Sequence, residues 1–276
     1  MKIGVLTSNQ HRHTFFANFL AKNLPVGVVV MEPKTASPRE VGKGKEEDQI
    51  LNRYFDERDQ VERDILTGGD NLDLPSGVQV VTPLPGKISE AEVIDQLLAQ
   101  QVDTLAVFGT SILKDPLLAA FRGRIVNIHL GVSPYYRGSG TNFWAMYNED
   151  LHLVGSTIHY IDPGIDTGEI ICHVQAPIVD GDTPHTIGNH VIRDSVHGIV
   201  GVLQLLGEGP VPSMPQWKAE NEHLYRRRDF TADILSDLLS RWEQGLVRRF
   251  LKKQAKGHLD NVRILPLPEK AGSTTV

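Results

Sequence analysis

Cysteine is almost absent from this chain, and so are a long apolar run and an excess of positive charge. Cys172 is the single cysteine among 276 residues, so no disulfide can form within the chain, and we expect a cytoplasmic location. No apolar stretch approaches the ~20 residues of a membrane-spanning helix. The opening MKIGVLTSNQ is too short and polar for a secretory signal. The net charge of −6 argues against a surface built for nucleic acid, and we expect no nucleic-acid partner.

A metal-binding pattern is also missing, although the chain has eleven histidines. No histidine pair has the i, i+4 spacing with a carboxylate, and His11-x-His13 is isolated. We therefore predict no metal site.

What is present is an alternation of buried strands and amphipathic helices, which indicates a parallel α/β sheet. Strand-like runs, separated by helix-spaced segments, cover Lys2–Leu6, Val26–Met31, Val78–Val81, Thr104–Phe108, Arg124–His129, Leu153–Tyr160 and Ile170–Val174. Ser89 and Glu92 form the sequence pattern of a capping box, and Asp182-Thr183-Pro184 predicts the start of a long helix. The predicted fold is Rossmann-like: an open, mostly parallel sheet with helices on both faces and a small C-terminal extension.

The chain divides, on this interpretation, near residue 210. We predict a catalytic domain over residues 1–210, with a charged, peripheral insertion at about 32–75 that contains one helix. Residues 211–276 form a small helical extension and tail after the linker GEGPVPSMPQWK. The helical stretch Thr231–Lys253 either packs at the interface of a homodimer or on the core of its own chain.

A polar pair marks the end of the strand at Arg124–His129. Asn127 and His129 are two residues apart, so their side chains share one face of the strand. Ligands bind at the carboxyl ends of strands in open α/β sheets. An amide N–H can stabilise an oxyanion, and a histidine can move a proton, if a carboxylate orients it. The loop HYIDPGIDTG supplies Asp162 and Asp166, and composition does not choose between them.

Three motifs in order carry a resemblance. Asn127-Ile128-His129 is followed by SPYYRG and then by GSTIHYIDPGIDTGEII, in which His159 precedes Asp166 by seven residues. The set resembles the 10-formyltetrahydrofolate-dependent formyltransferases, which include the glycinamide ribonucleotide, methionyl-tRNA and amino-sugar enzymes. The resemblance implies that Asn127, His129 and Asp166 are the catalytic trio. It also implies 10-formyltetrahydrofolate as co-substrate and a primary amine of a small molecule as acceptor.

The same resemblance implies where the two substrates bind. The folate would contact the strand end in GTSIL and the loop before Asp166, at Ser111, Ile112, Leu113, Tyr160, Ile161, Gly164 and Ile165. The first strand lacks the family's Gly-Ser-rich phosphate loop, and TSNQHRHTFF stands there instead. We expect the acceptor to contact Ser8, Asn9, His11, Arg12, Tyr136 and Arg137, the first four at a helix N-terminus that could hold a phosphate.

The acceptor that we expect is a nucleotide-linked amino sugar or another small amine, since SPYYRGSGTNFW and YRRRDFT are most similar to the amino-sugar enzymes. Three alternatives remain. They are a hydrolase that releases formate from the folate, a protein similar to methionyl-tRNA formyltransferase, and a folate-binding protein without catalysis. Neither the acceptor nor a role for His159 follows from the sequence.

Overall fold

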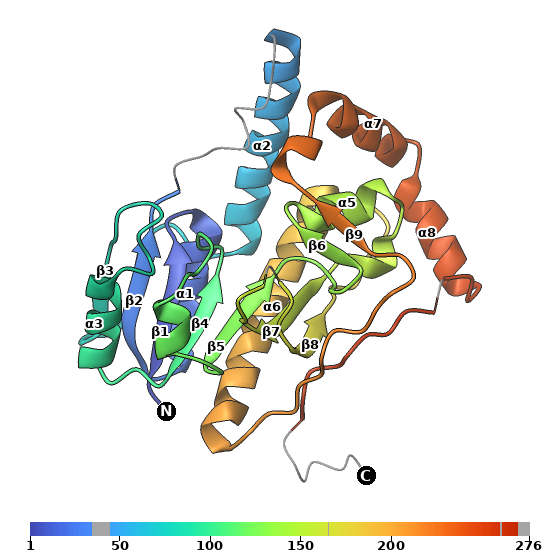
Figure 1. Ribbon diagram of the computed structural model, residues 1–276. Helices are drawn as coiled ribbons and strands as arrows, with labels where there is room; N and C mark the ends of the chain where they lie inside the picture. Colours follow the sequence, from blue (N-terminus) through green and yellow to red (C-terminus); the bar gives the residue numbers. More distant parts are fainter. Residues whose placement is uncertain (35–44, 165, 260, 270–276) are drawn as a thin grey trace.

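A seven-stranded, mostly parallel sheet forms the centre of the molecule (Figure 1). The structure is a computed structural model that describes residues 1–34, 45–164, 166–259 and 261–269, with the backbone alone given for 45–48. The strand order is β3-β2-β1-β4-β5-β7-β8. The bounds are β1 Ile3–Ser8, β2 Val26–Glu32, β3 Gln79–Val81, β4 Thr104–Phe108, β5 Ile125–His129, β7 Ser156–Tyr160 and β8 Ile170–Val174. The α/β prediction is confirmed.

One strand runs against the others in this sheet. The first five strands in the order pair in parallel, whereas β7 pairs antiparallel with both β5 and β8. The apolar runs of β1 and β2 are buried along their whole length, as expected for strands that helices cover on both faces.

Two pairs of helices cover the two faces of the sheet. Helices α1 (His11–Asn23) and α6 (Pro184–Glu208) pack on one face, and α3 (Ala91–Ala99) and α4 (Leu117–Ala120) pack on the other. Helix α6 begins where the sequence predicts, because the hydroxyl of Thr183 accepts the amide N–H of Thr186 at 3.1 Å in a capping box.

The capping box predicted at Ser89 does not form. Helix α3 begins one residue later, and its N-cap Glu90 makes no side-chain cap. The Ser89 hydroxyl is buried and accepts the amide N–H of Lys114 at 3.0 Å, so it joins two loops and caps no helix.

The charged insertion is not peripheral, contrary to our expectation. Its helix α2 (Lys45–Ile65) packs on α6 and on α7 (Ala232–Glu243), as Figure 1 shows. Leu51 and Phe55 lie in an apolar cluster with Ala232 and Leu235 of α7. The helix predicted in this segment does form, and one stripe of it is buried.

The chain after residue 210 packs on the core of the same chain. Strand β9 (His223–Tyr225) pairs with β6 (Tyr136–Gly138) in a second, two-stranded sheet. The predicted helical stretch is divided into α7 and α8 (Leu246–Ala255) at Gly245, whose φ of 84° favours glycine. Leu235 and Leu238 of α7 have no exposed surface in the single chain.

Helix α5 (Thr141–Tyr147) follows β6. Within the described part of the chain, no helix combines the length and the apolar character needed to cross a membrane.

Candidate active site

The register of β5 and β7 brings Asn127 beside His159. The two residues are direct partners in the antiparallel ladder, as are His129 and Thr157. Side chains of such pairs lie on the same face of the sheet. Asn127 Nδ2 lies 3.0 Å from His159 Nε2, so the reversed direction of β7 creates the first contact of the site.

The hydrogen bonds of His159 fix both its tautomer and the orientation of Asn127. His159 Nδ1 lies 2.8 Å from the carbonyl oxygen of Tyr160 and therefore donates to it. Burial lowers the pKa of His159 to about 4, with a smaller contribution from the His129 charge. The neutral ring has Nε2 as an acceptor, and the Asn127 amide donates one of its two N–H groups there. The second N–H stays available to a substrate oxygen.

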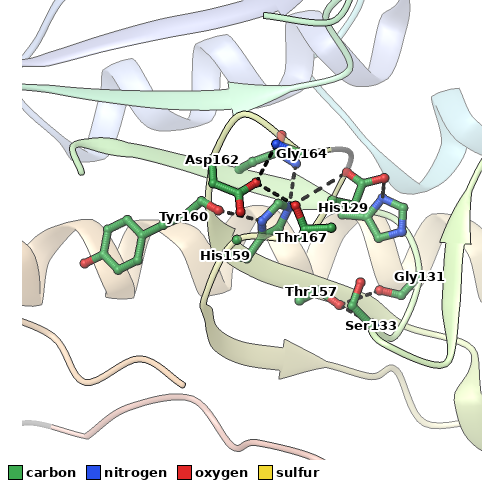
Figure 2. A network of polar contacts seen from close by, with 12 residues as sticks. His129, Gly131, Ser133, Thr157, His159, Tyr160, Asp162, Gly164 and Thr167 are labelled. Atoms are coloured by element: carbon green, nitrogen blue, oxygen red, sulfur yellow. Dashed lines mark hydrogen bonds and ion pairs between the residues drawn. The ribbon is translucent and has the colours of Figure 1, made fainter. Parts of the chain in front are cut away.

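Asp166, and not Asp162, faces His129. Asp166 Oδ2 lies 3.4 Å from His129 Nδ1, and Asp166 Oδ1 lies 4.0 Å from His159 Nε2. Asp162 Oδ1 instead accepts the Gly164 amide N–H at 3.0 Å and the Thr167 hydroxyl at 2.7 Å, which makes it a turn residue (Figure 2). The loop after β7 thus returns across the sheet and delivers one carboxylate to the two histidines.

His129 is held from its other side by the loop that follows β5. Its Nε2 lies 3.3 Å from the carbonyl oxygen of Tyr136. Both ring nitrogens therefore face oxygen acceptors, and a doubly protonated ring can donate to both. The hydroxyl of Thr157 donates to the Gly131 carbonyl at 2.6 Å and accepts the Ser133 amide N–H at 2.8 Å, which fixes the loop (Figure 2).

The residues predicted to bind folate, where the structure describes them, offer mainly apolar surface and few backbone N–H groups that lack a partner. Ile112 is 70% exposed, whereas Leu113 is buried in the cluster against which Ile161 packs. The Ser111 amide N–H already donates to Glu32 Oε2 at 2.9 Å. Tyr160 is half-buried.

The other two predicted folate residues lie in the same loop. Gly164 is exposed, and its amide donates within the Asp162 turn. Ile165 lies outside the described residues.

The segment after β1 reaches the same edge of the sheet, but not all of it is open to a ligand. Ser8 is fully buried, and Asn9 is exposed, with its side-chain oxygen accepting the Lys34 amide N–H at 3.2 Å. His11 is engaged at both ring nitrogens, by the Leu66 carbonyl at 2.8 Å and by Asp70 at 3.3 Å. These contacts tie helix α1 to the end of the insertion, and a contact between His11 and the acceptor stays a prediction.

Tyr136 also has a structural role in place of the one predicted. Its side chain has no exposed surface, and its hydroxyl donates to Asp150 at 2.6 Å and accepts from Asn148 at 2.9 Å. Its contribution to the site is the carbonyl oxygen beside His129. Arg137 is paired with Glu222 at 2.9 Å, so it links the loop to the C-terminal extension.

A cavity of about 270 Å³ opens at this edge of the sheet. Leu130 follows His129 directly and lines it, as do residues of α2, α5, α6 and the segment before α7. Its walls carry aromatic rings and arginines: Tyr54, Phe55, Phe143, Trp144, Phe230, Arg12, Arg58, Arg226 and Arg227. Among the described residues, no carboxylate belongs to the lining. Glu62 pairs with Arg12, and Asp59 with Arg58 at 2.6 Å, from outside it.

Sequence reasoning missed several of these residues. Tyr54, Phe55 and Arg58 lie in the insertion that we had expected to be peripheral. Thr157 could have been found, because a strand that pairs with β5 must place one residue opposite His129. No group of three or more metal-ligating side chains occurs within the residues that the structure describes.

Comparison with known proteins identifies a family for this chain. The profile of the formyl transferase family matches residues 2–203. This chain belongs to the formyl transferase family. The match spans the seven-stranded sheet together with Asn127, His129 and Asp166.

Curated formyltransferases are similar to parts of the chain. The methionyl-tRNA formyltransferase of Pelotomaculum thermopropionicum is 30% identical over 139 residues, which are 50% of this chain and 44% of that protein. The phosphoribosylglycinamide formyltransferase of Bacillus subtilis is 34% identical over 120 residues, which are 43% of this chain and 61% of that protein. The matched region therefore spans about half the length of these relatives.

Solved formyltransferase structures share the fold. The phosphoribosylglycinamide formyltransferase of Streptococcus pneumoniae has a TM-score of 0.52 at 23% identity, covering 75% of this chain and 99% of that one. A sugar N-formyltransferase from Shewanella has a TM-score of 0.51 at 15% identity, covering 83% and 78%. At these identities the formyl transferase fold is the common feature.

Proposed function

We propose that this protein transfers a formyl group from 10-formyltetrahydrofolate to the primary amine of a small acceptor, a nucleotide-linked amino sugar. The observation that carries the proposal is the convergence of three polar side chains from separate segments. Asp166 lies 3.4 Å from His129, and the Asn127 amide is oriented on the same face of the sheet. Membership of the formyl transferase family supports the reaction.

The three residues match the charges that develop in formyl transfer. The acceptor nitrogen bonds to the formyl carbon, and the carbonyl oxygen becomes an oxyanion. The second N–H of Asn127 stabilises that oxyanion, together with the N–H at Nε2 of protonated His129, which turns from the Tyr136 carbonyl at 3.3 Å to the substrate oxygen. Asp166 orients the imidazolium and takes up, through water, the proton that the amine loses. The oxyanion then reforms the carbonyl, the bond from the formyl carbon to N10 breaks, and Asp166 returns its proton, through water, to the folate nitrogen.

The donor fits the side of the site formed by β4 and the Asp166 loop. Exposed Ile112 and half-buried Tyr160 offer apolar and aromatic surface for a planar ring. This arrangement would present the formyl group to the face of the sheet that carries Asn127 and His129.

The acceptor fits the cavity beside Leu130. Aromatic walls suit a ring system, and the arginines suit phosphate groups. The Asn189 side-chain oxygen is buried there without a partner, so it offers an acceptor for a ligand hydroxyl. A nucleotide-linked sugar combines all three features. Of the acceptor residues proposed from the sequence, Arg12 lines this cavity, and Asn9 is exposed on the loop before it.

Turnover with a panel of amines tests the proposal. The protein is incubated with 10-formyltetrahydrofolate and each amine, and the folate absorbance is followed. We expect amine-dependent turnover, fastest with a nucleotide-linked amino sugar. Asn127→Ala and His129→Ala should each lose at least about a hundredfold in rate while they stay folded.

The same assay separates the other functions. Formate release that does not depend on an amine would indicate a hydrolase, and folate binding without turnover would indicate a binding protein. A His129→Ala variant with unchanged turnover would remove that residue from the mechanism.

A further inference from the structure

The segment before β9 reaches back to the loop that carries Asp166. Gln216 Nε2 lies 2.6 Å from the Asp166 carbonyl oxygen and 3.0 Å from the Gly168 carbonyl oxygen. One side-chain amide therefore donates its two N–H groups to two carbonyls of the same loop. We propose that Gln216 is a positioning residue that holds the carboxylate of Asp166 at His129.

The backbone of Asp166 has a conformation that needs such support. Its φ of 51° places a non-glycine residue in the left-handed region. This backbone conformation is unfavourable for a residue with a Cβ, and surrounding contacts are needed to hold it. Gly168 leaves no room for a side chain, since a Cβ there would come within 1.7 Å of the Tyr160 carbonyl oxygen. The loop thus contacts both the Tyr160 backbone and the Gln216 side chain.

Gln216 is itself fixed on both sides along the chain. Met214 and Ile170 exchange two backbone hydrogen bonds of 2.8 Å, so the segment runs beside the start of β8. Trp217 packs against Tyr135 and His173 and under the guanidinium of Arg263. The side chain between these contacts has little freedom to leave the loop.

The contacts of the Gln216 amide indicate that its nitrogen, and not its oxygen, holds the loop. The oxygen of Gln216 is buried without a partner, whereas its nitrogen has two. Buried polar atoms usually find partners, so this glutamine is placed for its donors and not for its acceptor. A side chain of the same size without the two N–H donors should fill the space but lose both hydrogen bonds to the loop that carries Asp166.

Two variants of similar length test this reading. Gln216→Met keeps the volume and removes both donors, and Gln216→Glu puts a charged oxygen against two carbonyl oxygens. We expect kcat to fall about tenfold to a hundredfold in Gln216→Met and further in Gln216→Glu. Ser213→Ala is the matched control, because Ser213 lies on the same segment and bonds Glu169 at 2.5 Å without touching Asp166. It should keep the wild-type kcat.

A double-mutant cycle distinguishes positioning from a general loss of structure. In an Asp166→Asn background, Gln216→Met should cost less than about twofold, because the side chain it positions has already lost its charge. An equal cost in both backgrounds would overturn the proposal, as would a kcat for Gln216→Met within twofold of the wild type. If Gln216→Met does not fold, the same cycle with Asp166→Asn is run with Gln216→Glu, which is nearly isosteric with the wild type.

Turnover rests on the proposed function, so a second measurement does not use it. Hydrogen exchange in peptides covering residues 160–169 should be faster in Gln216→Met than in Ser213→Ala. Wild-type protein without amine-dependent turnover but with this exchange pattern would refute the proposed function and support the hold on the loop. Exchange that is equal in the two variants would refute the hold itself.

Discussion

His173 lies in β8 and connects two distant parts of the chain. Because these contacts need a neutral imidazole ring, replacement of His173 should change how the unfolding free energy depends on pH. Its Nε2 donates to the Ser133 carbonyl at 2.8 Å, and its Nδ1 accepts the Leu265 amide N–H at 2.9 Å. A neutral ring satisfies both contacts, whereas a protonated ring would set one N–H against another. Burial accordingly lowers the pKa of His173 to about 4.

The size of the effect follows from the two states. An unfolded histidine titrates near pH 6.5, so between pH 6.5 and about 4 the unfolded chain binds a proton that the folded chain does not. The contribution of neutral His173 to the unfolding free energy is fully present above pH 6.5. It is lost as the pH falls toward 4, which lowers the unfolding free energy by about 3 kcal/mol. Burial lowers the pKa values of His159 and His185 to about 4 as well, and they act in the same direction.

Urea unfolding at a series of pH values measures the effect in wild type and in His173→Asn. Near pH 5.3 the slope of the unfolding free energy against pH should be lower in the variant by about 1.2 kcal/mol per pH unit. Tyr135→Phe is the control, since the Tyr135 hydroxyl accepts the Arg263 amide N–H at 2.8 Å and secures the same C-terminal segment. It should cost about 1 kcal/mol at every pH and keep the wild-type slope. Equal slopes in wild type and His173→Asn would refute the reasoning.

Two further substitutions test the loops around the site. Thr157→Val should leave the Gly131 carbonyl and the Ser133 amide without partners, lowering the unfolding free energy by about 2–4 kcal/mol in urea titrations; a change below about 0.5 kcal/mol would contradict the role of that hydroxyl. Gly168→Ala should displace the loop, since its Cβ would meet the Tyr160 carbonyl oxygen, and turnover should fall at least tenfold; an unchanged rate would show that the loop tolerates the shift.

Much of the central sheet could be predicted from the sequence, because its strands are continuous apolar runs. The strands ending at Phe108 and His129 end where the pattern predicts, and the first strand continues two residues past the predicted Leu6, to Ser8. Local chemistry also favoured the site: Asn127 and His129 alternate on one strand, and Asp-Pro-Gly is a turn, which left Asp166 for the histidine once the structure showed the loop.

Long-range contacts were beyond the sequence pattern. Nothing in the composition of the charged insertion indicates that Phe55 meets Phe230, since the contact joins segments far apart in the chain. Gln216 was placed in a linker because prolines surround it. His159 remained undecided, because its role depends on which strand lies beside β5 and in which direction.

The register of the β5–β7 pairing decides which side chains share a face of the sheet. Side chains along a strand point up and down in turn, so a slip of one residue would move His159 to the far side of the sheet. Asn127 would then face an apolar neighbour. The β7–β8 ladder contains an irregularity between Ile158 and His159, whereas the β5–β7 ladder stays in step. The orientation of Asn127, the proposed oxyanion donor, therefore depends on the register of the β5–β7 ladder, and no small adjustment of rotamers could restore it after a slip.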